Sequence, residues 1–100
     1  MEGGVRGFPG MIVLKSHNYS DWKIKMEDLS IVKDLYQPID RSEIPMGVLE
    51  FEWKLLNRKM VATIRKCVDV SVIQRMANDT NAYEMWHKLS GLYERKNALI

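Results

Sequence analysis

The residues that could carry chemistry are few and lie far apart in the sequence. His17 and His87 each lack a second histidine four residues away or a cysteine pair, the spacings typical of metal sites. Cys67 has one adjoining cation, Lys66, but lies on an apolar stripe, so a buried thiol is expected rather than a reactive thiolate. The carboxylates lie among lysines, as on a solvated helix face. We therefore expect no catalytic residue, no cofactor, no metal site and no enzyme activity.

The composition indicates one small folded domain. The 100 residues are 46% hydrophobic and 28% charged, which is typical of a globular chain, and the net charge of +2 is too small to indicate nucleic-acid binding. A single cysteine forms no internal disulfide and suits an intracellular protein. No apolar run is long enough for a signal sequence or a membrane span, so we expect a cytoplasmic protein without membrane contact.

The apolar residues of 49–67 recur at intervals of three and four, the periodicity of an α-helix. On a helix they fall within an arc of roughly 80°, with charged residues on the opposite side. Such a stripe needs partners, so this segment is expected to be the central helix of a bundle. Its inward residues are Leu49, Trp53, Leu56, Met60, Ile64 and Cys67.

A first long helix is predicted over about residues 21–33. Ser20 is a suitable N-cap because its hydroxyl accepts from the free N–H groups of the first turn, and Tyr19 is placed to pack on Ile24. Pro38 ends the segment, since the residue before a proline leaves helical geometry, and a loop follows over 39–47. The inward-facing residues are Trp22, Met26, Leu29, Ile31, Val32 and Leu35.

A last helix that begins after Asn81 and a short one over 72–77 complete the bundle. Asn81 can accept from the first turn of the last helix, and Glu84 can return a bond, which forms a capping box. Asp69 or Ser71 caps the short helix. Val72, Ile73 and Met76 are expected to close one end of the core, and the last helix contributes Ala82, Met85, Trp86, Leu89 and Tyr93.

Residues 1–13 are expected to form a flexible or extended arm. Residues 1–10 carry four glycines and Pro9, but they neither follow a strand nor open a helix as a phosphate-binding loop does. Residues 11–14 should form a short extended piece that lies across the bundle or pairs with a similar segment. The sequence thus predicts an all-α fold, a small bundle of three longer helices and one short over residues 14–97. Residues 98–100 are interpreted as the start of a truncated continuation.

Two groups of surface residues are candidates for binding. Phe51, Leu55 and Ala62 fall together opposite the core stripe, and a second apolar strip of this kind often packs on a partner. Lys54, Arg58 and Arg65 form a basic line that is either a solvated face or a contact for phosphates or an acidic partner. The three tryptophans, one in each long helix, could form a ligand cage or a base-stacking platform, but core packing is the expected role.

Three blocks of the sequence occur in an order that resembles the Gag polyprotein of copia-type LTR retrotransposons. The family opens with N-Y-x-x-W-x-x-x-M-x-x-L, and this chain has Asn18-Tyr19-Ser20-Asp21-Trp22-Lys23-x-x-Met26-x-x-Leu29. A middle block is similar around Trp53 and Ala62-Thr63-Ile64-Arg65. A final block is similar to T-A-x-E-x-W-x-x-L-x-x-x-Y, with Asn81-Ala82-x-Glu84-x-Trp86-x-x-Leu89-x-x-Leu92-Tyr93. Departures include Ser30, where a leucine is common, and Asn81, where threonine caps.

The resemblance implies the N-terminal half of a helical capsid, whose copies associate into virus-like particles that package element RNA. The expected partner is therefore a second copy of the chain or another protein. RNA capture would belong mainly to downstream regions, because the zinc knuckle is not in this sequence. One alternative is a domesticated or captured Gag domain that binds a different host or pathogen protein. A weaker alternative is direct RNA binding through the basic line.

Overall fold

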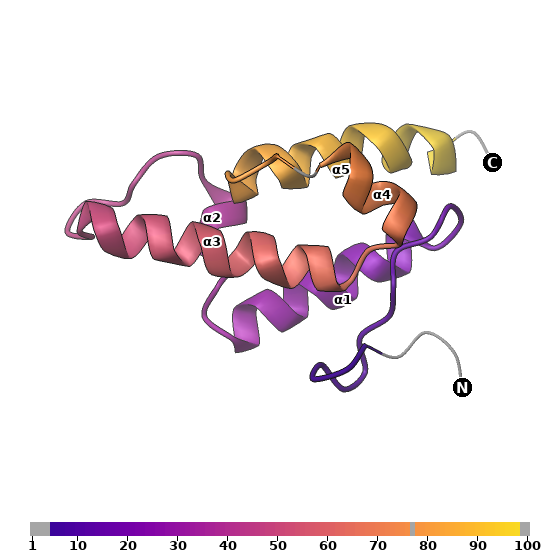
Figure 1. The fold of residues 1–100 in the computed structure, drawn as a ribbon, viewed down its shortest axis with the longest axis horizontal. Coiled ribbons are helices and arrows are strands. Elements are labelled where there is room, and N and C mark those ends of the chain that lie inside the picture. Colours follow the sequence, from indigo (N-terminus) through magenta and orange to yellow (C-terminus); the bar gives the residue numbers. More distant parts are fainter. Residues whose placement is uncertain (1–4, 77, 99–100) are drawn as a thin grey trace.

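The structure is a computed structural model that describes residues 5–76 and 78–98, with side chains as far as Glu94. These ranges contain five helices and no strand (Figure 1), which confirms the predicted all-α fold. Ala77 and residues 99–100, which the predicted short helix and the expected continuation included, lie outside the described residues. The helices are α1 (Tyr19–Val32), α2 (Gln37–Asp40), α3 (Glu50–Lys66), α4 (Val70–Arg75) and α5 (Ala82–Ala98).

The inner faces of α1 and α3 meet in the core. The indole N–H of Trp22 donates to the carbonyl of Cys67 at 2.8 Å, and the hydroxyl of Ser30 lies 3.5 Å from the sulfur of Met60. Ser30 is fully buried and also donates to the Met26 carbonyl at 2.7 Å, so this hydroxyl takes up core space without leaving a donor unpaired. The long helix α3 runs along the longest axis of the molecule, between α1 and α5 (Figure 1).

Most residues expected in the core are buried there. The rings of Trp22 and Trp86 lie 5.6 Å apart between centroids, and Tyr19 stacks on both Trp22 and Tyr93. Aromatic pairs at such distances stabilise a core beyond the area that they bury. The buried set contains Trp22, Met26, Trp53, Met60, Ile64, Cys67, Trp86 and Leu89, and the half-buried set that packs on the core contains Leu29, Leu56 and Tyr93.

The start of α1 differs from the expectation. The helix begins at Tyr19, and Asn18 rather than Ser20 stands at the N-cap position. The amide of Asn18 organises the preceding turn, because it accepts from the Lys15 N–H and donates to the carbonyl of Val13. Tyr19 is buried while Ile24 is 60% exposed, so the predicted packing between these two side chains is wrong.

The outer face of α1 was also predicted wrongly. Ile31 and Val32 were expected inside, but they are 55% and 79% exposed. The buried stripe contains Tyr19, Trp22, Met26 and Ser30. Ile31 follows Ser30 by one residue and therefore projects about 100° away from that stripe. This helix carries more apolar side chains than its inner face can bury.

The end of α1 is set by backbone geometry and not by Pro38. Asp34 has a positive φ of 58°, the N–H of Asp34 donates to the Ile31 carbonyl, and the N–H of Leu35 donates to the Ser30 carbonyl. These two bonds form a Schellman motif, which ends a helix by satisfying its last carbonyls. Pro38 instead lies in the first turn of α2, where its missing N–H costs nothing. The predicted loop over 39–47 therefore begins only after Asp40.

The described part of the N-terminal arm packs on the bundle. Leu14 forms an isolated parallel bridge with Val68, in which the Leu14 N–H donates to the Cys67 carbonyl and the Asp69 N–H donates to the Leu14 carbonyl. Met11 and Leu14 are both buried in the core. Residues 5–10 form two successive turns, in which the Phe8 N–H donates to the Val5 carbonyl and the Met11 N–H donates to the Phe8 carbonyl. Residues 11–14 are an integral part of the fold.

Two caps position the last helices. The carboxylate of Asp69 accepts from the hydroxyl and the backbone N–H of Ser71 at 2.8 and 3.2 Å, and these bonds lower the pKa of Asp69. The side-chain oxygen of Asn81 accepts from the Glu84 N–H at 2.9 Å, so Asn81 caps α5 as predicted. The cap at Asp69 starts α4 at Val70, two residues before the predicted start.

Candidate interaction surface

The outer face of α3 carries an exposed apolar ridge. Phe51 is 67% exposed, Leu55 is 52% exposed, and Ala62 is exposed beside them. The inner face of α3 is anchored by the buried Met60 and Ile64, so the ridge stands on a helix of 17 residues whose position is fixed by the core. We call Phe51, Leu55 and Ala62 the α3 ridge.

Further apolar side chains are exposed at the end of the molecule where α3 begins. Met46 is fully exposed in the preceding loop, and Leu49 is 57% exposed (Figure 1 shows the loop and the first turn of α3 at one end). Leu49 had been expected in the core stripe. It occupies the N-cap position with extended backbone, so the helical periodicity does not apply to it.

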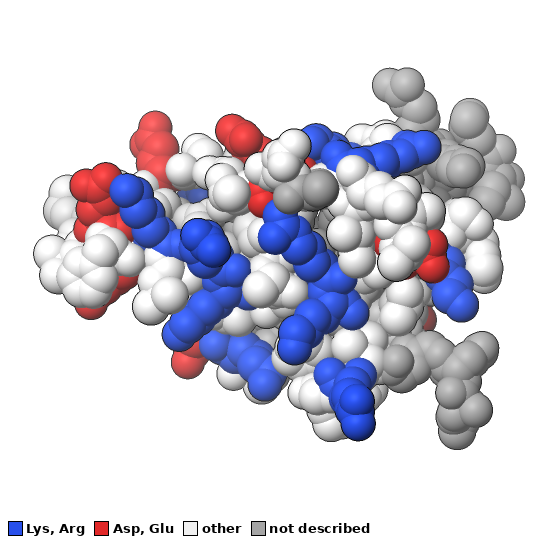
Figure 2. Space-filling view, viewed as in Figure 1, with Lys and Arg blue, Asp and Glu red and all other residues white. Residues whose placement is uncertain are grey.

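Cations flank the α3 ridge on both sides. At about 100° per residue, Lys54 and Arg58 lie to one side of the ridge, and Lys59 and Lys66 lie to the other. Figure 2 shows Lys and Arg side chains gathered across this face of the molecule, with the acidic side chains of the same view mostly towards its edges. Lys54 pairs with Glu50 at 3.8 Å, but both side chains are at least 75% exposed, so this ion pair contributes little to stability.

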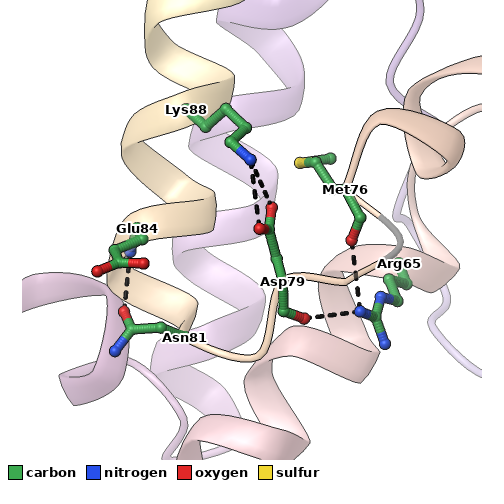
Figure 3. A network of polar contacts seen from close by, with 6 residues as sticks. All are labelled: Arg65, Met76, Asp79, Asn81, Glu84 and Lys88. Atoms are coloured by element: carbon green, nitrogen blue, oxygen red, sulfur yellow. Dashed lines mark hydrogen bonds and ion pairs between the residues drawn. The ribbon is translucent and has the colours of Figure 1, made fainter.

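Arg65 does not belong to the freely exposed part of the basic line. Its guanidinium is half-buried and donates to the backbone carbonyls of Asp79 at 2.7 Å and Met76 at 3.4 Å (Figure 3). The Asp79 carboxylate is in turn held by Lys88 at 3.0 and 3.2 Å (Figure 3). The expectation that Arg65 faces water with Lys54 and Arg58 is therefore wrong, because this side chain fixes the segment that leads into α5.

Shallow hollows lie between α3 and the segment before α5. One, of about 520 Å³, is lined by Arg58, Lys59, Val61, Ala62, Arg65, Asn78, Asp79 and Thr80. Its neighbour, of about 400 Å³, is lined by Trp53, Lys54, Asn57, Arg58, Thr80 and Asn81. The polar groups of these linings are amides, cations, the Thr80 hydroxyl and the Asp79 carboxylate, which pairs with Lys88. The geometry suits surface contact with a partner.

The outer face of α1 is a second exposed apolar surface, which sequence reasoning missed. Ile24 is 60% exposed, and Ile31 and Val32 lie on the same outer side of the helix. The available signal was the distribution of apolar residues around the whole helix, since four inward positions already account for the buried stripe. We call Ile24, Ile31 and Val32 the α1 face.

The titratable groups show no catalytic arrangement among the described residues. Cys67 is completely buried, and burial raises the pKa of its thiol to about 11. His17 is exposed, and His87 is exposed and stacks on Tyr83 at 4.2 Å. No cluster of three or more histidine, cysteine or acidic side chains in the described ranges could hold a metal ion. None of the helices there is long and apolar enough to cross a membrane.

Comparisons of the chain with protein-family models, with curated proteins and with solved structures found no match.

Proposed function

We propose that this chain is a structural protein–protein interaction module that associates with copies of itself, as the resemblance to the capsid region of copia-type Gag implies. The observation that carries the proposal is the α3 ridge, where Phe51 and Leu55 stand exposed on a helix with an anchored inner face. The proposal includes no enzyme activity and no cofactor. It also includes a cytoplasmic location, which suits the reduced thiol of Cys67.

The size of the ridge suits weak, repeated contacts. Burying one large apolar side chain contributes about 1.5–3 kcal/mol, so Phe51 and Leu55 can drive association without making it permanent. The surrounding cations and the nearby Glu50 add charges that can fix the orientation of a partner. Assemblies built from many copies need contacts of this kind, because each contact must form and break independently.

The mass of the protein in solution, measured by light scattering behind a sizing column over a wide concentration range, tests this function. We expect the mass to rise with concentration for the unchanged chain and to stay at the monomer value for Phe51→Asp and Leu55→Asp. Val70→Asp is a matched control, because Val70 is 68% exposed on α4 and lies off the ridge. Circular dichroism must show unchanged helicity in all variants. A monomer at every concentration contradicts the proposal.

A second candidate function is binding to the phosphate backbone of RNA, and the gathering of cations in Figure 2 favours it. Arg58 and Lys59 are exposed, and no described carboxylate forms an ion pair with either of them. Fluorescence polarisation of a labelled single-stranded RNA at low salt tests this function. Binding that falls steeply with salt and with Arg58→Glu supports it, and an absence of binding at low salt excludes it.

A further inference from the structure

The α1 face and the α3 ridge each consist of exposed apolar residues with charged side chains beside them, and the charges are of opposite sign. On α1, Ile24, Ile31 and Val32 surround Asp28, and Glu27 lies beside Ile31 and Ile24. Asp21 pairs with Lys25 at 3.5 Å within the helix. No described cation forms an ion pair with Asp28 or Glu27. Lys25 lines the same hollow as Asp28 and Val32, but its ammonium pairs with Asp21, so the two other carboxylates stay open to a partner.

On α3 the uncompensated charge is positive. Arg58 lies on one side of the α3 ridge and Lys59 on the other, and the ion pairs among the described side chains leave both without a carboxylate partner. Lys66 continues the Lys59 side of the ridge near Phe8. An apolar centre with a basic border therefore lies on one helix, and an apolar centre with acidic side chains lies on another.

These two surfaces point in opposite directions. The Ser30 hydroxyl lies 3.5 Å from the Met60 sulfur, and the Trp22 indole donates to the Cys67 carbonyl. The first contact joins the inner face of α1 to the inner face of α3, and the second joins it to Cys67 directly after α3. The outer faces of the two helices therefore point away from each other. One copy can therefore offer its α3 ridge to one neighbour and its α1 face to another.

We propose that the α3 ridge of one copy binds the α1 face of the next copy. This inference rests on the proposed self-association and specifies its geometry. Charge complementarity identifies a second copy as the occupant, because Arg58 and Lys59 then meet Asp28 and Glu27 around a joint apolar centre. A contact between two α3 ridges would bring Arg58 and Lys59 against their own copies, and a contact between two α1 faces would bring the carboxylates together. Both symmetric arrangements are therefore disfavoured.

The head-to-tail contact has a consequence for assembly size. Each copy retains one unused surface after binding, so further copies can add until the rotation between neighbours closes a ring or continues as a filament. A symmetric contact would instead stop at two copies. The inference thus predicts association beyond the dimer for the unchanged chain.

Two single variants and their mixture test the inference. Phe51→Asp blocks the α3 ridge, and Ile31→Asp blocks the α1 face; Ile31 is 55% exposed, so the change should leave the helical circular dichroism signal intact. We expect each variant alone to be a monomer by light scattering. Their equimolar mixture should form a complex of two chains and no larger species, because the mixture supplies one intact surface of each kind.

The outcomes separate this inference from the proposed function. If Ile31→Asp alone associates as the unchanged chain does, or if the mixture stays monomeric while the unchanged chain associates, the head-to-tail geometry is wrong and self-association stands. If the unchanged chain is a monomer at every concentration, the proposed function fails and the inference with it. A mass that stops at the dimer for the unchanged chain also overturns the inference.

Charge reversal provides an independent readout. We expect Asp28→Lys and Arg58→Glu each to weaken association about tenfold. An equimolar mixture of the two should recover part of it, because the mixture offers one unchanged contact between Arg58 and Asp28 and one contact with the two charges exchanged. Asp40→Lys is a matched control, since Asp40 is an exposed carboxylate on α2 and belongs to neither surface. Equal weakening by Asp40→Lys would show a net-charge effect only and would overturn the proposed pairing.

Discussion

The side-chain oxygen of Asn57 accepts a hydrogen bond from the backbone N–H of Ala82 at 2.9 Å, and this contact joins the middle of α3 to the first residue of α5. The amide nitrogen of Asn57 donates to the Trp53 carbonyl one turn earlier. Both Asn57 and Ala82 are buried. The N–H groups of a first helical turn have no partner within their helix, so α3 supplies through one side chain what α5 cannot supply itself.

We expect Asn57→Ala to lower the free energy of unfolding by about 1–3 kcal/mol, because the buried N–H of Ala82 would lose its acceptor. Urea unfolding followed by circular dichroism measures this change. Asn57→Asp is the control, since it keeps an acceptor oxygen and places negative charge near the N-terminus of α5, where the helix dipole favours it. An unchanged free energy of unfolding for Asn57→Ala would contradict this role of the bond to Ala82.

Arg65 and Arg58 should respond differently to truncation although they lie on neighbouring sides of the same helix. We expect Arg65→Ala to lower the free energy of unfolding by about 2 kcal/mol, because two backbone carbonyls at the end of α4 and before α5 lose a charged donor. Arg58→Ala should change it by less than about 0.5 kcal/mol, since Arg58 is exposed. Denaturant unfolding compares the two variants. Similar values for both would contradict a structural role specific to Arg65.

Cys67 should react slowly with thiol reagents in the folded protein, and its ionisation should lower the free energy of unfolding at alkaline pH. Burial raises the pKa of its thiol from 9.0 to about 11, so at pH 8 only about one folded molecule in a thousand carries the thiolate that reacts. We expect a thiol reagent to label the native chain slowly and the urea-unfolded chain fast. Fast labelling of the native chain at pH 8 would contradict a closed core around Cys67.

The same pKa difference fixes the sign of the pH effect. As pH rises from about 9 to about 11, the unfolded chain loses the Cys67 proton before the folded chain does, so it binds fewer protons and the free energy of unfolding falls. Burial also raises the pKa of Tyr19, which adds to the fall at higher pH. Cys67→Ala should flatten the pH dependence just above pH 9, and unfolding curves at several pH values measure it.

The sequence predicted α3 and α5 well because each carries one apolar stripe with helical spacing. Met60 and Ile64 of α3 and Cys67 directly after it are all buried, as their spacing indicated. In α1 the apolar residues surround the helix, so periodicity could not separate the inner side from the outer one. Ile31 and Val32 were consequently assigned to the core, and the surface on which they lie was missed.

The predictions for Arg65 and Pro38 were wrong because they depend on contacts that helical periodicity cannot predict. The helical spacing placed Arg65 on the solvent side of α3, but the segment that follows α4 packs beside this side chain, and the carbonyls of Met76 and Asp79 accept from it. Pro38 follows α1 and also begins α2, and proline is compatible with both roles. The backbone hydrogen bonds of Asp34 and Leu35 end α1 before Pro38, so Pro38 begins α2 and does not end α1.

The parallel bridge between Leu14 and Val68 ties the N-terminal segment to the backbone just after α3. Its two hydrogen bonds join residues that are far apart in the sequence, so the bridge closes a loop that contains α1, α2 and α3. A shortened chain that starts at α1 would lose both bonds and the buried side chains of Met11 and Leu14, and we expect it to be less stable than the full chain.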